Sequence, residues 1–285
     1  VSGLCLKSGN AVILRGSSYC LDSNIAILEV LQNSLSLNNC NKNIFQIIES
    51  KDRQDTIEFM NLTEFVDLIV PRGGKGLIQT LVDNSKVPFI LDGDGNVHLY
   101  IHQDAKKEHI IDIVINSKVQ RPGVCNALET LLINSQIYQD MGSLIIEELL
   151  ENEVELFVDE KIKEDFPNLN LANESHYETE FLDLKLAVKV VDSVDQAIEH
   201  IKVYSSGHTE AILTESKEVA DTFAKSIDSS VIFINSSTRF TDGEMFGFGS
   251  EIGISTQKLH VRGPMGLEAL TNERYVVTGE GTVRG

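Results

Sequence analysis

Short apolar runs alternate with amphipathic segments along most of the chain, and this alternation constrains the fold more than any single motif. The runs predicted to form strands are 11–15, 44–48, 66–70, 87–91, 154–158, 185–191, 209–214 and 231–235. Between them lie segments whose apolar residues recur at helical spacing, such as 105–118, 136–150 and 193–203. This order of elements predicts right-handed βαβ units around parallel sheets, with helices on both faces. The predicted fold class is therefore α/β.

The first residues suggest that the chain begins inside a domain. Val1–Asn10 has the pattern of the end of a helix, closed by Gly9 and Asn10, and a strand pattern follows at once. The 285 residues suffice for two domains with real cores. We place a domain boundary near residue 112, although no linker rich in proline, glycine or serine marks it.

Composition narrows the possible partners. The net charge of −19 repels nucleic acid and anionic membranes on average, while a local cationic pocket for an anionic substrate remains compatible with it. The four cysteines show no C-x-x-C pairing and no clustering with histidine, which favours a reduced compartment and no metal site. No apolar run approaches membrane-spanning length. We expect a cytoplasmic protein with no nucleic-acid and no membrane partner.

The segment Gln120–Thr130 places one cysteine, Cys125, in a tight turn after Pro122 and Gly123. A thiol on such a turn can point into a cleft, where backbone N–H groups lower its pKa or hold an oxyanion. Cys125 is therefore a candidate nucleophile. The alternative is an inert, buried cysteine, because cysteine is among the most buried residue types.

Two predicted strand ends carry cationic turns. Arg15 and its following glycine and serines come directly after the first strand, and Pro71–Gly76 contains Arg72 and Lys75 within a glycine-rich turn that opens a helix. Ligands of open α/β sheets bind at such strand ends, and helix N-termini attract anions. The turn Pro71–Gly76 matches neither the dinucleotide-binding fingerprint nor the phosphate-loop fingerprint. An ordinary turn with solvated basic residues is the competing interpretation, and the acidic turn 92–96 is also read as a plain turn.

Residues 236–268 are dense in glycine, serine, threonine and arginine. Long glycine-rich loops in a compact protein commonly have a function. Arg239 and Arg262 lie in this region and are candidates for binding an anion. Further on, Tyr275–Gly279 has a strand pattern, and an exposed strand edge there would invite pairing with another subunit.

Five segments together resemble one family, the γ-glutamyl phosphate reductases (glutamate-5-semialdehyde dehydrogenases) of the aldehyde dehydrogenase superfamily. They are Ser8–Gly16, Val66–Ile78, Gln120–Leu132, Val191–Thr214 and Phe246–Thr271. The resemblance runs essentially from end to end. The sequence departs from the family pattern in the turn at 91–94 and in HVRGP, where HARGP is usual. The family also has more of its cofactor domain before the residue that matches Val1, and we expect such a part to exist upstream.

The resemblance implies a domain plan. It predicts an aldehyde dehydrogenase-like fold with the C-terminal portion of a Rossmann-type cofactor-binding domain at 1–111. A catalytic domain at 112–240 would follow, then a glycine-rich return segment lining the site at 241–271. The last part, 272–285, would be an oligomerisation strand. A homo-oligomer, dimer or tetramer, is therefore expected.

The resemblance also implies a reaction, the reduction of L-γ-glutamyl 5-phosphate by NADPH to L-glutamate 5-semialdehyde with release of phosphate, in proline biosynthesis. By this resemblance Cys125 attacks the acyl phosphate and forms a thioester, and its backbone N–H is a candidate oxyanion donor. No glutamate occurs in 88–96, where hydrolytic aldehyde dehydrogenases place a general base. That absence suits a reaction in which water does not hydrolyse the thioester.

The cofactor residues implied by resemblance fall on turns already noted. Arg15 would lie at the adenosine ribose and could pair with the extra phosphate of NADP. Arg72, Gly73 and Gly74 would lie near the pyrophosphate. Glu180 matches loosely the glutamate that holds the nicotinamide ribose; one more solvated acid in an acidic run is the alternative.

Arginine suits both the carboxylate and the phosphate of such a substrate. Arg121, Arg239 and Arg262 are the candidates, and Arg121 is favoured for the acyl phosphate because it lies close to Cys125 in sequence. Structural ion pairs with the many acids are the competing interpretation. Two other readings stay open: the reductase half of a bifunctional pyrroline-5-carboxylate synthase, and a catalytically silent oligomerising relative. A functional link to glutamate 5-kinase is also conceivable.

Overall fold

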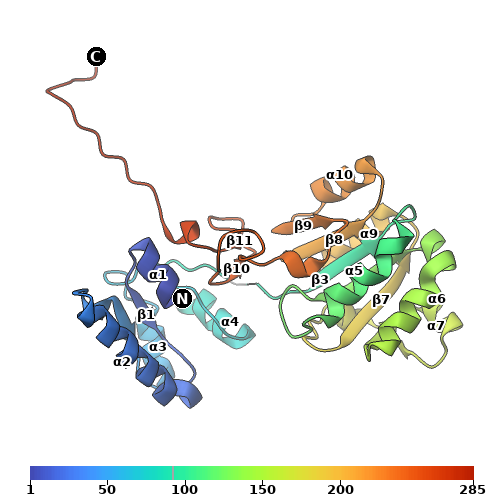
Figure 1. Cartoon of the computed structure of the whole chain (residues 1–285), viewed down its shortest axis with the longest axis horizontal. Helices are drawn as coiled ribbons and strands as arrows, with labels where there is room; N and C mark the ends of the chain where they lie inside the picture. The colour runs from blue at the N-terminus through green and yellow to red at the C-terminus, as the bar shows by residue number, and fades with distance from the viewer. Residues whose placement is uncertain (92) are drawn as a thin grey trace.

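The computed structural model describes residues 1–91 and 93–285, apart from the side chain of Lys75. Two bodies of secondary structure are joined by the segment that follows residue 91, and the segment with β10 and β11 lies between them (Figure 1). The first body holds residues 1–91 and is called the N-terminal unit below. The second is built on a large parallel sheet and is called the catalytic unit, after the catalytic domain that the resemblance implies. Asp92, the first residue of the predicted acidic turn, lies outside the described residues.

The catalytic unit is organised by a parallel sheet with the strand order β6-β5-β7-β4-β3-β8-β9. Its strands are β3 (Val97–Ile101), β4 (Leu128–Asn134), β5 (Glu155–Val158), β6 (Asn170–Leu171), β7 (Lys185–Val191), β8 (Thr209–Leu213) and β9 (Val231–Ile234). Its helices are α5 (Lys107–Val119), α6 (Ser135–Glu151), α7 (Glu160–Asp165), α8 (Glu174–Tyr177), α9 (Val194–Tyr204) and α10 (Lys217–Ser226). The predicted α/β class with a parallel sheet is confirmed.

Alternate strand residues face opposite layers of helices. Leu99, Leu131 and Ile133 belong to the core under α5, α6 and α7, and are fully buried. Tyr100 and Leu132, their neighbours in sequence, belong to the core under α9 and α10. Because both faces are covered, these strands are continuous apolar runs rather than alternating ones. Figure 1 shows the helix layers on either side of the sheet.

The N-terminal unit is smaller and more open. It contains α1 (Ser2–Ser8), β1 (Val12–Leu14), α2 (Leu21–Leu37), β2 (Phe45–Ile47), α3 (Arg53–Phe59) and α4 (Lys75–Asn84). β1 and β2 pair in parallel, and a single parallel bridge joins Ile69 to Phe89. Gly9 ends α1 in the left-handed region, at φ 80°, with its N–H on the carbonyl of Leu6. This confirms the predicted helix end, since a left-handed C-cap favours glycine.

The C-terminal segment returns to the N-terminal unit. β10 (Ile254–Ser255) and β11 (Gly263–Pro264) form an antiparallel pair. Ile252 and Met265 are buried in one apolar cluster with Ile90 of the N-terminal unit. The end of the chain, 271–285, runs away from both bodies, and its residues carry no strand within this chain (Figure 1). The expected strand at 275–279 is therefore not formed inside the single chain, where no neighbouring edge pairs with it.

Four short turns of 3-10 helix complete the elements of the described residues: 18–20, 42–44, 238–240 and 268–270.

Two other expectations differ from the structure. The runs 66–70 and 87–91 form the bridge at Ile69 and Phe89 rather than full strands. The expected boundary near 112 is later than the division in packing, because β3 and α5 already belong to the large sheet. Apolar patterning identifies a strand but not the sheet that it joins. Across the described residues, no helix has the length and apolar composition needed to cross a membrane.

Candidate active site

Cys125 lies in a turn at the amino edge of the large sheet, directly before β4. Its residue is partly buried, whereas Asn126 and Ala127 after it are buried. Asn126 anchors the turn: its Nδ2 donates to the carbonyl of Thr241 at 2.8 Å, and its own carbonyl accepts from Oγ1 of Thr238 at 2.7 Å. These hydrogen bonds of the buried Asn126 thus anchor the cysteine turn, while Cys125 remains near the surface.

Helices that precede strands of a parallel sheet end at the sheet's amino edge. Here α5, α6, α9 and α10 each end shortly before β4, β5, β8 and β9 begin. The C-terminus of a helix carries a partial negative charge, so this edge is electrostatically negative by construction. An anionic substrate at Cys125 therefore requires local cations.

Two of the predicted arginines supply such cations. Arg121 is exposed in the cysteine turn, and Arg239 is partly buried beside it. Burial lowers the pKa of Arg239, the charge of Arg121 lowers it further, and Cys125 and Asp242 raise it. These mutual effects place Arg121, Arg239 and Cys125 within electrostatic reach of one another. Arg239 Nε also donates to Oε1 of Gln120 at 2.8 Å, which fixes the guanidinium.

Arg262 has a different environment. Its Nη1 lies 2.9 Å from Oδ1 of Asp228, and its Nη2 donates to the carbonyl of the same residue at 2.7 Å. Lys258 also pairs with that carboxylate, and both cations hold the pKa of Asp228 below its usual value. The guanidinium of Arg262 is thus engaged in an ion pair, which agrees with the competing interpretation for this residue.

The segment that links the two units passes against Cys125. A Cβ added to Gly95 would lie 1.7 Å from the carbonyl oxygen of Cys125, so only glycine permits this approach. The N–H of Gly95 donates to Oε1 of Glu180 at 2.6 Å. Glu180, predicted at the nicotinamide ribose, is therefore connected to the cysteine turn through the backbone of Gly95.

A buried ion pair joins α5 and β4, the two elements that flank the same turn. Lys118 in the last turn of α5 contacts Oε2 of Glu129 in β4 at 2.8 Å, and both side chains are fully buried. The other oxygen of Glu129 accepts from the N–H of Leu182 at 3.0 Å. Burial raises the pKa of Glu129 to about 7 against the opposing effect of Lys118, and burial lowers the pKa of Lys118.

Two buried histidines lie at the amino ends of central strands, His98 in β3 and His208 directly before β8, and a third, His200 of α9, packs against His98. His98 Nδ1 lies 3.1 Å from Oε2 of Glu210, which also accepts from the backbone N–H of His98. His208 Nδ1 lies 2.8 Å from Oγ1 of Thr209. Burial lowers the pKa of His208 to about 4, and the pKa of His200 is lowered even further. His200 and His208 are therefore neutral at physiological pH.

Apart from Glu180, the predicted cofactor residues lie on the N-terminal unit. Arg15 is exposed directly after β1. Gly74 is the N-cap of α4, its side gives onto open space, and no side chain caps the helix, so its first N–H groups suit a phosphate. Gly73 packs against Leu77. Arg72 donates to the carbonyl of Ile252 at 3.2 Å. The residues around α4 thus fit a pyrophosphate.

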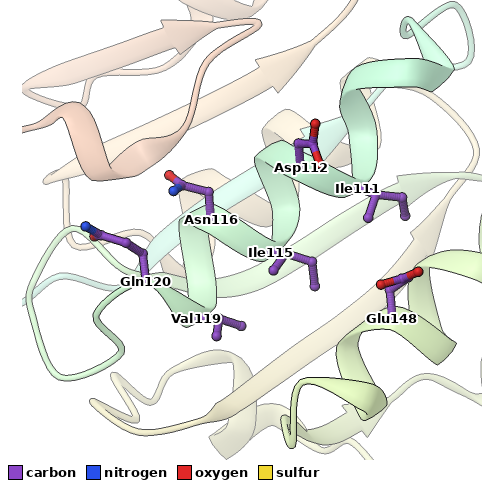
Figure 2. Close-up of a pocket in the computed structure, with 7 residues that line it drawn as sticks. All are labelled: Ile111, Asp112, Ile115, Asn116, Val119, Gln120 and Glu148. Atoms are coloured by element: carbon purple, nitrogen blue, oxygen red, sulfur yellow. The ribbon is translucent and has the colours of Figure 1, made fainter.

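A hollow lies elsewhere, on the outer surface of α5 and α6. It is a shallow groove whose floor is Ile111, Ile115 and Val119 and whose rim is polar (Figure 2). Gln120 at its end is the partner of Arg239. The groove follows the helix, and neither Cys125 nor the two arginines beside it line the groove.

Comparison with known proteins gives concordant results. No family model matches the chain. A γ-glutamyl phosphate reductase of Thermoanaerobacter pseudethanolicus is 50% identical over 283 residues, which cover 99% of this chain and 68% of the relative. A γ-glutamyl phosphate reductase of Listeria monocytogenes is 48% identical with the same coverage. The crystal structure of the Thermotoga maritima γ-glutamyl phosphate reductase superposes with a TM-score of 0.96 at 46% identity, covering 99% of this chain and 68% of that one.

A more distant structure, an acetylating aldehyde dehydrogenase of Geobacillus thermoglucosidasius, shares the fold with a TM-score of 0.76 at 17% identity, covering 99% of this chain and 72% of that one. A large parallel sheet with a cysteine turn at its amino edge, beside a smaller α/β unit, thus defines an aldehyde dehydrogenase-like fold. Within that class, the chain belongs to the γ-glutamyl phosphate reductase family. Its members take a small-molecule substrate in proline biosynthesis and need a nicotinamide cofactor.

Sequence reasoning missed the contacts that build the site. Gly95 was read as part of a plain turn, and Lys118 and Glu129 were not singled out. One signal was available: Glu129 interrupts the apolar run from Ala127 to Ile133, and a charge inside a buried strand needs a partner. The identity of that partner depends on the packing of α5 on β4.

Proposed function

We propose that this chain reduces L-γ-glutamyl 5-phosphate to L-glutamate 5-semialdehyde with NADPH, through a thioester on Cys125. The observation that carries the proposal is the cysteine turn itself, where Cys125 stands near the surface with Arg121 and Arg239 in electrostatic reach. Membership in the family supplies the substrate class.

The chain's own residues account for the first half of the reaction. The Cys125 thiolate attacks the acyl carbon, the carbon–sulfur bond forms, and the bond to the phosphate oxygen breaks with its electron pair leaving on phosphate. Arg121 and Arg239 stabilise the charge on the phosphate, because guanidinium groups bind phosphate oxygens bidentately. The backbone N–H of Cys125 serves as a donor to the carbonyl oxygen.

The reduced nicotinamide, when bound, supplies the hydride that converts the thioester to the aldehyde level. Glu180 would orient the nicotinamide ribose, the turn at Arg72, Gly73 and Gly74 would receive the pyrophosphate at the N-terminus of α4, and Arg15 would bind the ribose phosphate of NADP. The oxyanion formed on reduction then expels Cys125 as thiolate. Arg262 lies outside this core because Asp228 engages it, and we assign it a supporting role toward the substrate carboxylate.

We also propose a homo-oligomer. The end of the chain, 272–285, is exposed, with Tyr275 and Val277 largely in solvent. An extended arm with exposed apolar side chains suits pairing with a second copy of the chain. A dimer or tetramer in solution is the expected result of light scattering.

The test is Cys125→Ser in the purified full-length polypeptide, with Cys40→Ser as the matched control because Cys40 is exposed and distant in the N-terminal unit. We expect phosphate-dependent oxidation of glutamate semialdehyde by NADP to fall by about 1,000-fold or more in the first variant, since the nucleophile is lost. The control should keep its rate. Near-normal activity of Cys125→Ser would rule the proposal out.

A further inference from the structure

We propose that Lys118 and Glu129 form a positioning device that holds the loop of Glu180 against the cysteine turn. We call the loop 178–184 the Glu180 loop. The structural part of the proposal stands on contacts alone, whereas its effect on catalysis rests on the proposed function. Neither Lys118 nor Glu129 touches the expected substrate, so both would be positioning residues.

The pair brackets the cysteine turn. Lys118 lies in the last turn of α5, Glu129 is the second residue of β4, and Cys125 lies in the eleven-residue separation between them. Their 2.8 Å contact has no solvent exposure on either side. Buried ion pairs seldom increase stability over apolar residues of equal volume, and their best-supported use is to specify one geometry. A geometric role is therefore the stronger explanation of this pair.

Glu129 also determines the backbone of the Glu180 loop. Its Oε1 accepts from the N–H of Leu182, which has φ 53°, a left-handed value that is uncommon for leucine. The side chain of Leu182 is 48% exposed, so apolar burial does little to impose this conformation. The hydrogen bond that the Leu182 N–H donates to Glu129 supports this conformation. On the other side, the Leu182 carbonyl packs near Gly123 of the cysteine turn.

The Glu180 loop passes this constraint to the cysteine. Glu180, two residues before Leu182, accepts the N–H of Gly95 at 2.6 Å. Gly95 in turn abuts the carbonyl of Cys125. A continuous set of contacts therefore runs from Lys118 through Glu129, Leu182, Glu180 and Gly95 to Cys125.

A pair of double variants isolates the hydrogen bond to Leu182. Lys118→Met/Glu129→Gln removes both charges but keeps an acceptor oxygen, whereas Lys118→Met/Glu129→Met removes both charges and the acceptor. Met has about the length of Lys and Glu and therefore fills the same space. Because both charges are removed together, neither variant leaves a buried unpaired charge. Lys107→Met/Asp140→Asn, which removes an exposed ion pair between α5 and α6, is the control.

The first readout is amide hydrogen exchange without substrate or cofactor. We expect the amides of Leu182 and Gly95 to exchange about tenfold or more faster in the Met/Met variant than in the Met/Gln variant. A change at Leu182 alone would show a local role and overturn the proposal, as would equal rates in the two variants. If the Met/Met variant does not fold, amide exchange in the wild-type protein tests the proposal. A Leu182 amide that exchanges as fast as the amides of an exposed loop would contradict the positioning device.

The second readout is catalysis. We expect the Met/Met variant to lose about 10- to 100-fold in kcat, with a raised KM for NADPH, because a small displacement of positioning groups has effects of this size. The Met/Gln variant should recover most of that loss, and the control should match wild type. If wild-type protein shows no reductase activity, the proposed function fails, yet the exchange rates still test the positioning device.

Discussion

The two units of the molecule differ in how completely their cores are enclosed. In the catalytic unit, helices cover both faces of the sheet, and strand residues such as Leu131 are fully buried. In the N-terminal unit the main cluster is small, centred on Leu28, Leu35 and Phe45, while Val30 of the same helix is 68% exposed. The proposed nucleophile Cys125 lies on the enclosed unit, and the proposed cofactor turns at Arg15 and Gly74 lie on the open one.

Matched truncations in the two cores give the largest expected effect. Leu131→Ala should cost about 3–5 kcal/mol of unfolding free energy, because it empties a site enclosed on every side. Leu28→Ala should cost about 2 kcal/mol or less, since its surroundings can relax toward solvent. Urea unfolding followed by circular dichroism measures both. Equal costs would show that the two cores are equally well packed, contrary to the comparison.

Two glycines test the same contrast by adding a methyl group. Gly95→Ala should destabilise the protein by about 1–3 kcal/mol and disturb the cysteine turn, because the new Cβ overlaps the Cys125 carbonyl. Gly74→Ala meets no atom within 4 Å and should change stability by less than about 0.5 kcal/mol. Alkylation of Cys125 by iodoacetamide reports the disturbance. An unchanged rate in Gly95→Ala would contradict the close approach.

Acid should weaken the catalytic unit selectively. The pKa of His208 is about 4 when folded, below the ordinary value of 6.5, so between these values the unfolded chain binds the proton and the folded chain does not. Stability is then lost as pH falls from 6.5 to 4, by about 1.4 kcal/mol per pH unit for each such histidine. His200 acts with the same sign.

Residues 1–91 contain no histidine, so this loss should be confined to amides of the catalytic unit. Amide exchange at pH 7 and pH 5, corrected for intrinsic rates, measures it region by region. The variant His208→Gln should show a smaller pH dependence than wild type. A uniform loss over both units would mean that the carboxylates, rather than the histidines, control the acid response.

Much of the fold was predictable because local pattern decides it. The strands at 185–191 and 231–235 and the helices near 105–118 and 136–150 match β7, β9, α5 and α6 closely. The runs at 66–70 and 87–91 were not predictable in the same way. Apolar composition allowed strands there, but pairing is limited to one bridge, and pairing is a property of neighbours rather than of the run.

The candidate site divides along the same line. Cys125 was recognisable from its turn and from family resemblance, and the structure leaves it partly exposed as that role requires. The contacts of Gly95 and Glu129 join residues brought together by the sheet, so no local pattern contains them. Arg239 and Arg262 were equivalent in the sequence, and only the positions of Gln120 and Asp228 separate them.

The helix ends at the amino edge of the sheet bear on how a turnover finishes. Four helices direct their negative ends toward the edge that carries Cys125, and the whole chain has a net charge of −19. In the proposed reaction, arginines hold the phosphate of the substrate there against a field that otherwise repels it. Once the bond to carbon is broken, that field would push the free phosphate dianion outward, so the architecture of the sheet would favour release of phosphate.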